Sequence, residues 1–479
     1  MYLGLDIGTS GVKAVILDAL GRVVAQATTP LSVSRPHELW SEQDPDAWWG
    51  ATEATILQFP SVLRAGIKGI GLAGQMHGAT LLGIDDRPLR PAILWNDGRA
   101  FAECAELEAS VPDLRNIVGN IAMPGFTAPK LAWVRRHEPE IFEQIKTVLL
   151  PKDYVRLCLT GEKASDRSDS AGTLWLDVGA RNWSDVLLAA TGLTREHMPR
   201  LYEGAEVSGS LRAELAARWG MDTVPVAAGA GDNAAGAAGV GVISDGDALL
   251  SLGTSGVIFV ATRDFRPNPA GAVHAFCHCL PDTWHQMSVH LSAASCLDWA
   301  GGLTGLDVPA LLAAAEQAGA AAGPELFLPY LSGERTPHND PHVRGAFLRL
   351  SNETDPGRLA VAVLEGVAFA HADGLAALRA AGTRIEKLSV IGGGARSRFW
   401  GTVFASVLGL PLDYLDGGEV GPALGAARLA NIATTGAEPS EICTRPLVRE
   451  TILPDLALAE RLAPKVEKFR AAYPALKRF

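Results

Sequence analysis

Cysteines, basic runs and long apolar runs are all scarce in this chain of 479 residues. Its six cysteines are scattered, which favours reduced thiols in the cytosol over a disulfide framework. The segment His274–Cys279 holds two histidines and two cysteines, but no second pair of ligands follows at a distance. Cysteines spaced in this way are not expected to bind zinc.

The charge, hydropathy and motif patterns argue against several further classes of protein. The net charge is −11 and no run of Lys and Arg is present, so no nucleic-acid surface is expected. No run of 18 strongly apolar residues and no basic segment followed by an apolar core is found, so neither a membrane span nor a secretory signal is predicted. A Walker loop is absent, and Gly4–Gly11 has the wrong spacing for a dinucleotide fingerprint.

The sequence does contain one pentapeptide twice. Gly-Thr-Ser-Gly-Val occurs at Gly8–Val12 and again at Gly253–Val257, about half the chain apart. Each copy lies between two apolar stretches, which predicts strand, glycine turn, strand. Glycines let the backbone approach a ligand closely, and Thr and Ser supply hydroxyl groups, which suits a phosphate chain. Two related halves holding a nucleotide are therefore predicted, the alternative being two unrelated turns.

The two copies differ in their flanking residues. Alignment places Asp6 opposite Ser251 and Lys13 opposite Ile258. Only the first loop therefore keeps a carboxylate and a cation, and a bound metal–nucleotide complex needs one such carboxylate. The first loop is expected to handle the metal and the second to hold the nucleotide.

Strands alternate with helices along the chain, which indicates an α/β fold with two or three domains. The predicted strands are 2–7, 12–17, 22–28, 68–73, 223–229 and 387–391, and the predicted helices are 44–58, 234–240, 293–300, 308–318, 358–381 and 399–408. Asp44 is expected to cap helix 44–58, with Pro45 in its first turn. Residues 99–220 are predicted to form a mostly helical insertion, and residues 241–247 a hinge.

Three further segments carry candidate chemistry. Asp232 begins a helix, where a carboxylate is either an N-cap or a base for a hydroxyl that attacks phosphorus. Gly392–Gly394 allows close approach of a ring or ribose, or simply forms a tight turn. Gln75–His77 and Trp95–Arg99 mix aromatic, amide and charged groups, which suits a polyhydroxylated ligand but also any exposed turn.

Taken in order along the whole chain, these motifs resemble the FGGY family of carbohydrate kinases, within the actin-like and hexokinase-like ATPase superfamily. Further matching segments are Leu39–Asp44, Gly125–Trp133, Ser251–Gly256 and Pro329–His338. The second family signature departs at Arg349, where the family usually has Gly, and at Arg358, where it usually has an acid, amide or His. A turn and a helix start are expected there, with effects on local structure more than on chemistry.

The resemblance implies two ribonuclease-H-like domains around a central cleft. Residues 1–243 would bind sugar and carry the catalytic aspartate, residues 244–435 would bind nucleotide, and residues 436–479 would form a helical tail. The implied reaction is phosphorylation of D-xylulose at its 5-hydroxyl, with ATP and Mg²⁺. The family also implies a homodimer, while the cysteine, charge and hydropathy patterns above predict a cytoplasmic protein with no nucleic-acid or membrane partner.

Site residues follow from the same resemblance. Asp232 would be the general base, and Asp6 and Asp232 would serve the metal. The implied sugar contacts are Met76, His77, Trp95, Asn96, Asp97, Asp232 and Asn233. The implied nucleotide contacts are Thr9, Ser10, Lys13, Gly253, Thr254, Gly393, Gly394 and Ala395.

Other functions stay open at this stage. One is a kinase for ribulose, gluconate or glycerol, although glycerol enzymes usually carry Arg-Glu where Met76-His77 stand. Another is a non-kinase ATPase of the superfamily, which would need a peptide-binding domain or filament contacts. A catalytically dead regulator is disfavoured because Asp6 and Asp232 are both present.

Overall fold

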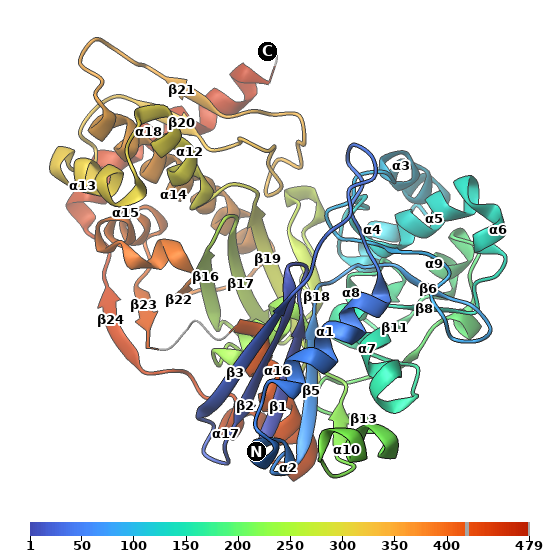
Figure 1. The fold of residues 1–479 in the computed structure, drawn as a ribbon. Helices are drawn as coiled ribbons and strands as arrows, with labels where there is room; N and C mark the ends of the chain where they lie inside the picture. The colour runs from blue at the N-terminus through green and yellow to red at the C-terminus, as the bar shows by residue number, and fades with distance from the viewer. Residues whose placement is uncertain (417–420, 478–479) are drawn as a thin grey trace.

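The chain folds into two lobes, each built on a seven-stranded mixed sheet (Figure 1). The computed structural model describes residues 1–416 and 421–477, and it gives the backbone but not the side chain of Ala395. The N-terminal sheet has the order β13-β14-β5-β1-β2-β3 with β15 beside β5, and the C-terminal sheet has the order β18-β19-β17-β16-β22-β23-β24. The predicted two-domain α/β fold is confirmed.

The same connectivity occurs in both sheets. Three antiparallel strands come first, β1-β2-β3 in one sheet and β16-β17-β19 in the other, and two parallel strands then extend each sheet beyond β1 or β16. The N-terminal strands are β1 (Tyr2–Ile7), β2 (Gly11–Leu17), β3 (Val23–Pro30), β5 (Gly69–Gly74), β13 (Val207–Ser210), β14 (Pro225–Ala227) and β15 (Ala230–Gly231). The C-terminal strands are β16 (Ala248–Leu252), β17 (Gly256–Thr262), β18 (His274–Cys277), β19 (Trp284–His290), β22 (Leu388–Ile391), β23 (Leu412–Leu415) and β24 (Val448–Ile452).

Both pentapeptides form hairpin turns, as predicted, but the two turns differ in length. Ile7 pairs with Val12, so four residues form the turn between β1 and β2. Leu252 pairs with Gly256, so only three residues form the turn between β16 and β17. The same five residues therefore form two hairpins whose strands pair in different registers.

This register difference corrects the alignment of the flanking residues. Lys13 pairs with Asp6 across β1 and β2. In the second hairpin, Ser251 pairs with Val257 rather than with Ile258. Because successive side chains on a strand face opposite sides, a shift of one residue puts Val257 in the place of Lys13. Ile258 is fully buried instead.

The predicted helices are present. They are α1 (Pro45–Leu57), α11 (Asp232–Gly239), α12 (Ser295–Thr304), α13 (Val308–Ala318), α14 (Pro356–Ala380) and α15 (Arg398–Leu408). The Asp44 side chain caps α1 by accepting from the N–H of Asp46, and Pro45 is the first helical residue, as expected. Gly50 lies exposed within the same helix.

Helix α14 is the one helix of the described residues that is long and apolar enough to cross a membrane. Some 78% of its apolar window is buried inside the protein, where it packs against α13, α15 and β20 (Leu326–Leu328). This burial identifies it as the central helix of the C-terminal core rather than a lipid-facing segment.

A mixed insertion follows β5, as the sequence predicted, and forms the right-hand part of Figure 1. Its helices are α3 (Phe101–Ser110), α4 (Leu114–Val118), α5 (Thr127–His137), α6 (Pro139–Phe142), α7 (Pro151–Thr160), α8 (Arg167–Ala171) and α9 (Asp185–Ala190). Its short strands are β6 (Thr80–Leu82), β7 (Ala92–Ile93), β8 (Thr147–Leu149), β9 (Ala164–Asp166), β10 (Leu176–Asp177), β11 (Asn182–Trp183) and β12 (Arg200–Tyr202).

Helix α16 (Gly421–Thr435) crosses between the lobes. It follows the C-terminal strand β23 in sequence, yet it packs on β1 and β5 of the N-terminal sheet and against α11. The chain then returns through α17 (Pro439–Ile442) to β24 and ends in α18 (Leu456–Leu476). The tail was expected to be helical, and β24 was missed because Arg449 and Glu450 interrupt its apolar pattern. The domain boundaries at 243 and 435 stay predictions.

Candidate active site

Sheet register brings Asp6 and Asp232 to one edge of the N-terminal sheet. Asp6 on β1 pairs with Ala73 on β5, and Ala73 pairs with Ala230 on β15. Asp232 follows two residues later as the first residue of α11. The carboxyl ends of parallel strands meet at one edge of a sheet, so the two aspartates face the same region.

The N-cap alternative for Asp232 does not hold, because Gly231 occupies the cap position. One oxygen of Asp232, Oδ1, accepts hydrogen bonds from the N–H and the side-chain amide of Asn233, at 2.7 and 2.8 Å. The other oxygen is left for a ligand. Asn233 itself is exposed.

Both aspartates lie in surroundings that disfavour their charge. Burial, and then the charge of Asp232, raise the pKa of Asp6 to about 7, against the attraction of Lys13. Burial raises the pKa of Asp232 to about 6. Oδ1 of Asp6 is buried without a hydrogen-bond partner. Carboxylate oxygens arranged in this way are the ligands that hard divalent cations prefer.

His77 follows the end of β5 in a strained backbone conformation, with a φ of 69°. Its Nδ1 lies 2.6 Å from the carbonyl oxygen of Gly172, so Nδ1 carries the proton and Nε2 is an acceptor. Burial lowers the pKa of His77 to about 3, so the ring is neutral at working pH. Met76 is buried beneath Gly231, where a Cβ would lie 3.0 Å from its Cγ.

Two residues that sequence reasoning did not assign hold this strained turn in place. The Thr127 hydroxyl and the Lys130 ammonium group donate to the carbonyl oxygen of His77 at 3.1 and 2.9 Å. Lys130 is fully buried, and burial lowers its pKa well below the usual value. Both residues belong to the segment Gly125–Trp133 that matched the first family signature. The family signature therefore marked both residues in the sequence, but it did not show that they hold the His77 turn.

A hydrogen-bond network joins the first loop to Trp95. The indole N–H of Trp95 donates to the Thr9 hydroxyl at 3.0 Å, and that hydroxyl donates to Gln75 at 2.7 Å. Gln43 extends the network to Gln75 and to the Thr9 carbonyl. The Thr9 hydroxyl proton is thus already used, and Thr9 positions Trp95, whose ring is 50% exposed. Ser10, next in the loop, is exposed.

Asp97, one of the expected sugar contacts, is held in place by the protein. Its side chain is buried, and its two oxygens accept four hydrogen bonds, from the backbone N–H groups of Ser41 and Arg99 and from the Arg99 guanidinium. These contacts fix the loop that presents Trp95 and Asn96. Asn96 is exposed.

The second loop and the glycine triplet lie together in the C-terminal lobe. Gly392 has a φ of 91°, and a Cβ on it would lie 2.7 Å from the carbonyl oxygen of Leu252, the residue before Gly253. Gly393 faces open space, and Thr254 is exposed. Gly392 therefore forms a tight turn, and Gly393 and Thr254 leave an open surface next to it. The Ala395 side chain lies outside the described residues.

The departures at Arg349 and Arg358 have the structural settings that were expected. Arg349 has a φ of 62°, the left-handed region that favours glycine, which explains the residue usual in the family. Arg358 lies in the first turn of α14, where its backbone N–H donates to the capping Asp355.

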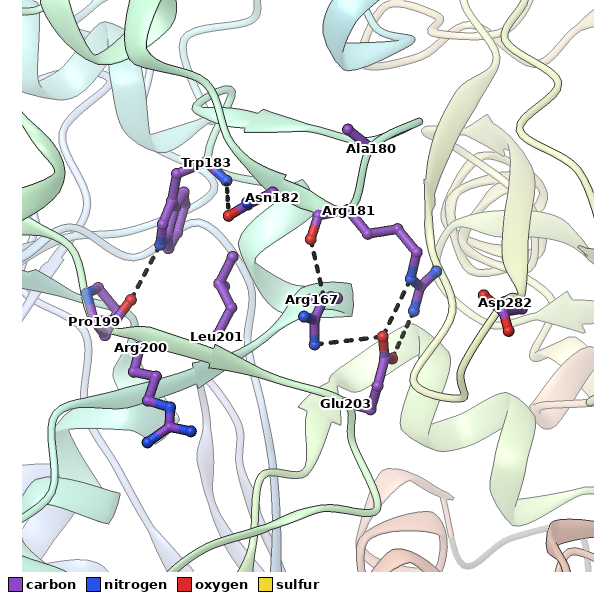
Figure 2. Close-up of a pocket in the computed structure, with 10 residues that line it drawn as sticks. All are labelled: Arg167, Ala180, Arg181, Asn182, Trp183, Pro199, Arg200, Leu201, Glu203 and Asp282. Carbon is purple, nitrogen blue, oxygen red and sulfur yellow. Dashed lines mark hydrogen bonds and ion pairs between the residues drawn. The ribbon is translucent and has the colours of Figure 1, made fainter.

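A polar cavity of about 440 Å³ lies elsewhere, where the insertion meets the turn between β18 and β19. Figure 2 shows Glu203 between Arg167 and Arg181 on its wall. Arg181 also donates to the carbonyls of Leu280 and Thr283, so it ties the insertion to the C-terminal lobe. None of the predicted site residues lines this cavity.

Comparison with known proteins identifies the family. The model of the FGGY carbohydrate kinase N-terminal domain matches residues 1–239, and that of the C-terminal domain matches residues 248–434. The chain belongs to the FGGY family of carbohydrate kinases. It is thus a phosphotransferase whose acceptor is an alcohol group.

Individual relatives cover the whole chain. The xylulose kinase of Escherichia coli (strain K12) is 57% identical, over 99% of both chains. A crystal structure described as a xyloylose kinase from Brucella ovis is 54% identical and has a TM-score of 0.97, covering 100% of this chain and 99% of that one. The xylulose kinase structure from Rhodospirillum rubrum is 32% identical with a TM-score of 0.93, over 100% and 99% of the chains.

Proposed function

We propose that this kinase transfers the terminal phosphoryl group of ATP to the 5-hydroxyl of D-xylulose. The observation that carries the proposal is the pair Asp6 and Asp232 at the same sheet edge as the His77 turn and Trp95. Full-length relatives that are named xylulose kinases support the choice of sugar. A kinase for ribulose, gluconate or glycerol remains the alternative.

Asp232 has the base role. Its free oxygen accepts the proton of the attacking hydroxyl while Asn233 holds the other oxygen. The orphaned oxygen of Asp6 and the carboxylate of Asp232 fit Mg²⁺, which when bound would neutralise part of the phosphate charge. Lys13, across the hairpin from Asp6, adds a cation beside the phosphates.

The other residues orient the two substrates. Nε2 of His77 accepts a hydrogen bond from a sugar hydroxyl, and the exposed face of Trp95 packs on C–H groups. Asn96 and Asn233 supply amide groups. On the nucleotide side, backbone N–H groups of Ser10 and Thr254 face the phosphates, while the N–H of Gly253 closes the turn by donating to the Ser255 carbonyl. Gly393 leaves room for adenosine, with Gly394 and Ala395 beside it.

The substrate is tested by ADP release with Mg-ATP and a panel of acceptors. We expect kcat/KM to be highest for D-xylulose among D-xylulose, D-ribulose, L-xylulose, gluconate and glycerol. Another sugar with a higher kcat/KM would show the proposed substrate to be wrong, while the family would stand.

Acid should inactivate the enzyme through Asp232. Because the folded-state pKa of this carboxyl is raised to about 6, a proton occupies the base below that pH. We expect log kcat/KM for the sugar to fall with a slope between one and two below about pH 6, because Asp6, whose pKa is raised to about 7, takes up a proton as well. Asn233→Ala should move this limb modestly to higher pH, since it removes the side-chain hydrogen bond that helps to hold the pKa of Asp232 down, while the backbone hydrogen bond stays.

The exposed Asp222, which precedes β14, provides the control for this pH profile. Asp222→Asn should leave the limb where it is. A limb that does not move in Asn233→Ala would assign the titration to another group.

The cellular setting rests on the composition of the chain, and the oligomeric state rests on the family. We propose a cytoplasmic homodimer whose ligands are D-xylulose and Mg-ATP, with no nucleic-acid or membrane partner. Light scattering of the purified protein would determine the oligomeric state.

A further inference from the structure

Arg335 has no ion-pair partner within the part of the chain that the structure describes. It lies between β20 and β21 (Ala346–Leu348) in the C-terminal lobe and is partly buried. Among the residues that the structure describes, no carboxylate lies within ion-pair distance of its guanidinium, whose one hydrogen-bond partner is His274. The buried Arg99 and Arg156 differ, because each pairs with an aspartate or glutamate.

His274 orients Arg335 without neutralising it. Asn120 Oδ1 accepts from the N–H of Ala275, so the 3.0 Å contact from this oxygen to Nδ1 of His274 places the ring proton on Nδ1. Nε2 then accepts from Nη1 of Arg335 at 3.2 Å. Burial, then the charge of Arg335, hold the pKa of His274 well below its usual value. The imidazole is therefore a neutral acceptor, and the other guanidinium N–H groups stay available.

Aromatic rings connect this arginine to the proposed sugar site. The Phe126 ring lies 5.8 Å from His274 and 4.6 Å from His77, measured between ring centroids. The charge of Arg335 contributes to the lowered pKa of His77, after burial and Lys130. Through His274 and Phe126, Arg335 is thus linked to the His77 turn of the site.

We propose that Arg335 binds the end of the sugar remote from the phosphorylated hydroxyl. This rests on the proposed function, in which Asp232 faces the 5-hydroxyl and the C1 hydroxyl and C2 carbonyl lie at the other end. A guanidinium only donates hydrogen bonds, and the carbonyl oxygen of a ketose only accepts them, so the two match. Because Arg335 comes from the C-terminal lobe and His77 from the N-terminal lobe, the bound sugar links the lobes.

Replacement of Arg335 should weaken sugar binding selectively. We expect Arg335→Gln to raise KM for D-xylulose about 10- to 100-fold, as for loss of a charged hydrogen-bond donor. KM for ATP and sugar-independent ATP hydrolysis should stay within about twofold of wild type. Arg335→Lys, which keeps the charge but loses the planar fork, should lie between wild type and Arg335→Gln.

A ketose analogue and a polyol locate the contact. If Arg335 binds the C2 carbonyl, Arg335→Gln should no longer distinguish D-xylulose from xylitol, which lacks this carbonyl, by KM. 1-Deoxy-D-xylulose keeps the carbonyl, so the substitution should raise its KM as much as that of D-xylulose. The matched control is Arg344→Gln, an exposed residue of the same segment that donates only to carbonyls of its own loop, and it should match wild type.

Several outcomes would overturn the assignment. These are an unchanged KM for the sugar, equal losses with sugar and ATP, or a lowered melting temperature that accounts for the loss. Should Arg335→Gln not fold, Arg335→Lys decides by the same readouts. Wild-type turnover of D-xylulose is measured in parallel, so failure of the proposed substrate is separate from failure of Arg335.

Discussion

Asp232→Ala is expected to fold and to lose kinase turnover by about 10³-fold or more. A sugar hydroxyl is a poor nucleophile near neutral pH, and removal of its base alone costs about 10²- to 10⁴-fold. The variant also loses one of two carboxylates that face the same sheet edge. KM for ATP should change less than kcat, because the contacts proposed for Ser10, Lys13 and the C-terminal lobe remain. Coupled measurement of ADP release gives both constants.

Asp232→Asn should raise the stability of the protein although it removes kinase activity. The folded-state pKa of Asp232 lies above its unfolded value, so the folded state binds the proton more tightly and loses stability as pH rises through about 6. At pH 7.5 the wild type is therefore destabilised by the charge at Asp232, whereas Asp232→Asn carries no charge there and is not. A higher melting temperature together with lost turnover would therefore identify a functional carboxylate.

Asp222→Asn is the matched control for Asp232, since Asp222 is an exposed aspartate outside the site. It should retain wild-type turnover and melting temperature. Wild-type-like turnover in Asp232→Ala would remove Asp232 from the mechanism.

Local signals made parts of this structure predictable. Asp44 and Pro45 set the start of α1 through capping and a fixed φ, and both effects depend only on neighbouring residues. The hairpins were predictable because apolar stretches flank a glycine turn. The place of Asp6 just before such a turn and of Asp232 at a helix start was predictable for the same reason.

Contacts between distant segments were not predictable. The hydrogen bonds from Thr127 and Lys130 to His77 join α5 to the turn after β5, and nothing local in either segment encodes them. The register of the second hairpin depends on how β17 packs, since the pentapeptide is identical in both copies. The hydrogen bond from the N–H of Ser41 to Asp97 likewise joins residues that lie far apart in the sequence.

The placement of α16 on the other lobe was the largest omission. Its sequence is rich in small residues, which sequence reasoning assigned to the C-terminal half. The reason appears only in the packing: a Cβ on Gly425 would lie 1.8 Å from the carbonyl oxygen of Ala235 on α11. Glycine permits two helix backbones to approach this closely.

Gly71→Ala is expected to destabilise the protein severely. Gly71 lies on β5 beneath α16, and its Cβ would lie 1.9 Å from the carbonyl oxygen of Ala426. That atom belongs to the helix backbone, so no side-chain rotation can relieve the overlap, and α16 must move away from the sheet. We expect a loss of about 3 kcal/mol or more in unfolding free energy, measured by urea denaturation.

Gly50→Ala is the matched control for this substitution and should have the opposite sign. Gly50 lies exposed within α1, and its Cβ would meet nothing within 4 Å. Alanine there should stabilise the protein by about 0.5 to 1 kcal/mol through helix propensity. Because α16 covers the strands that end at Asp6 and the His77 turn, Gly71→Ala should also lower kinase activity at temperatures below its unfolding midpoint. Wild-type stability in Gly71→Ala would mean that α16 does not rest on β5 at this distance.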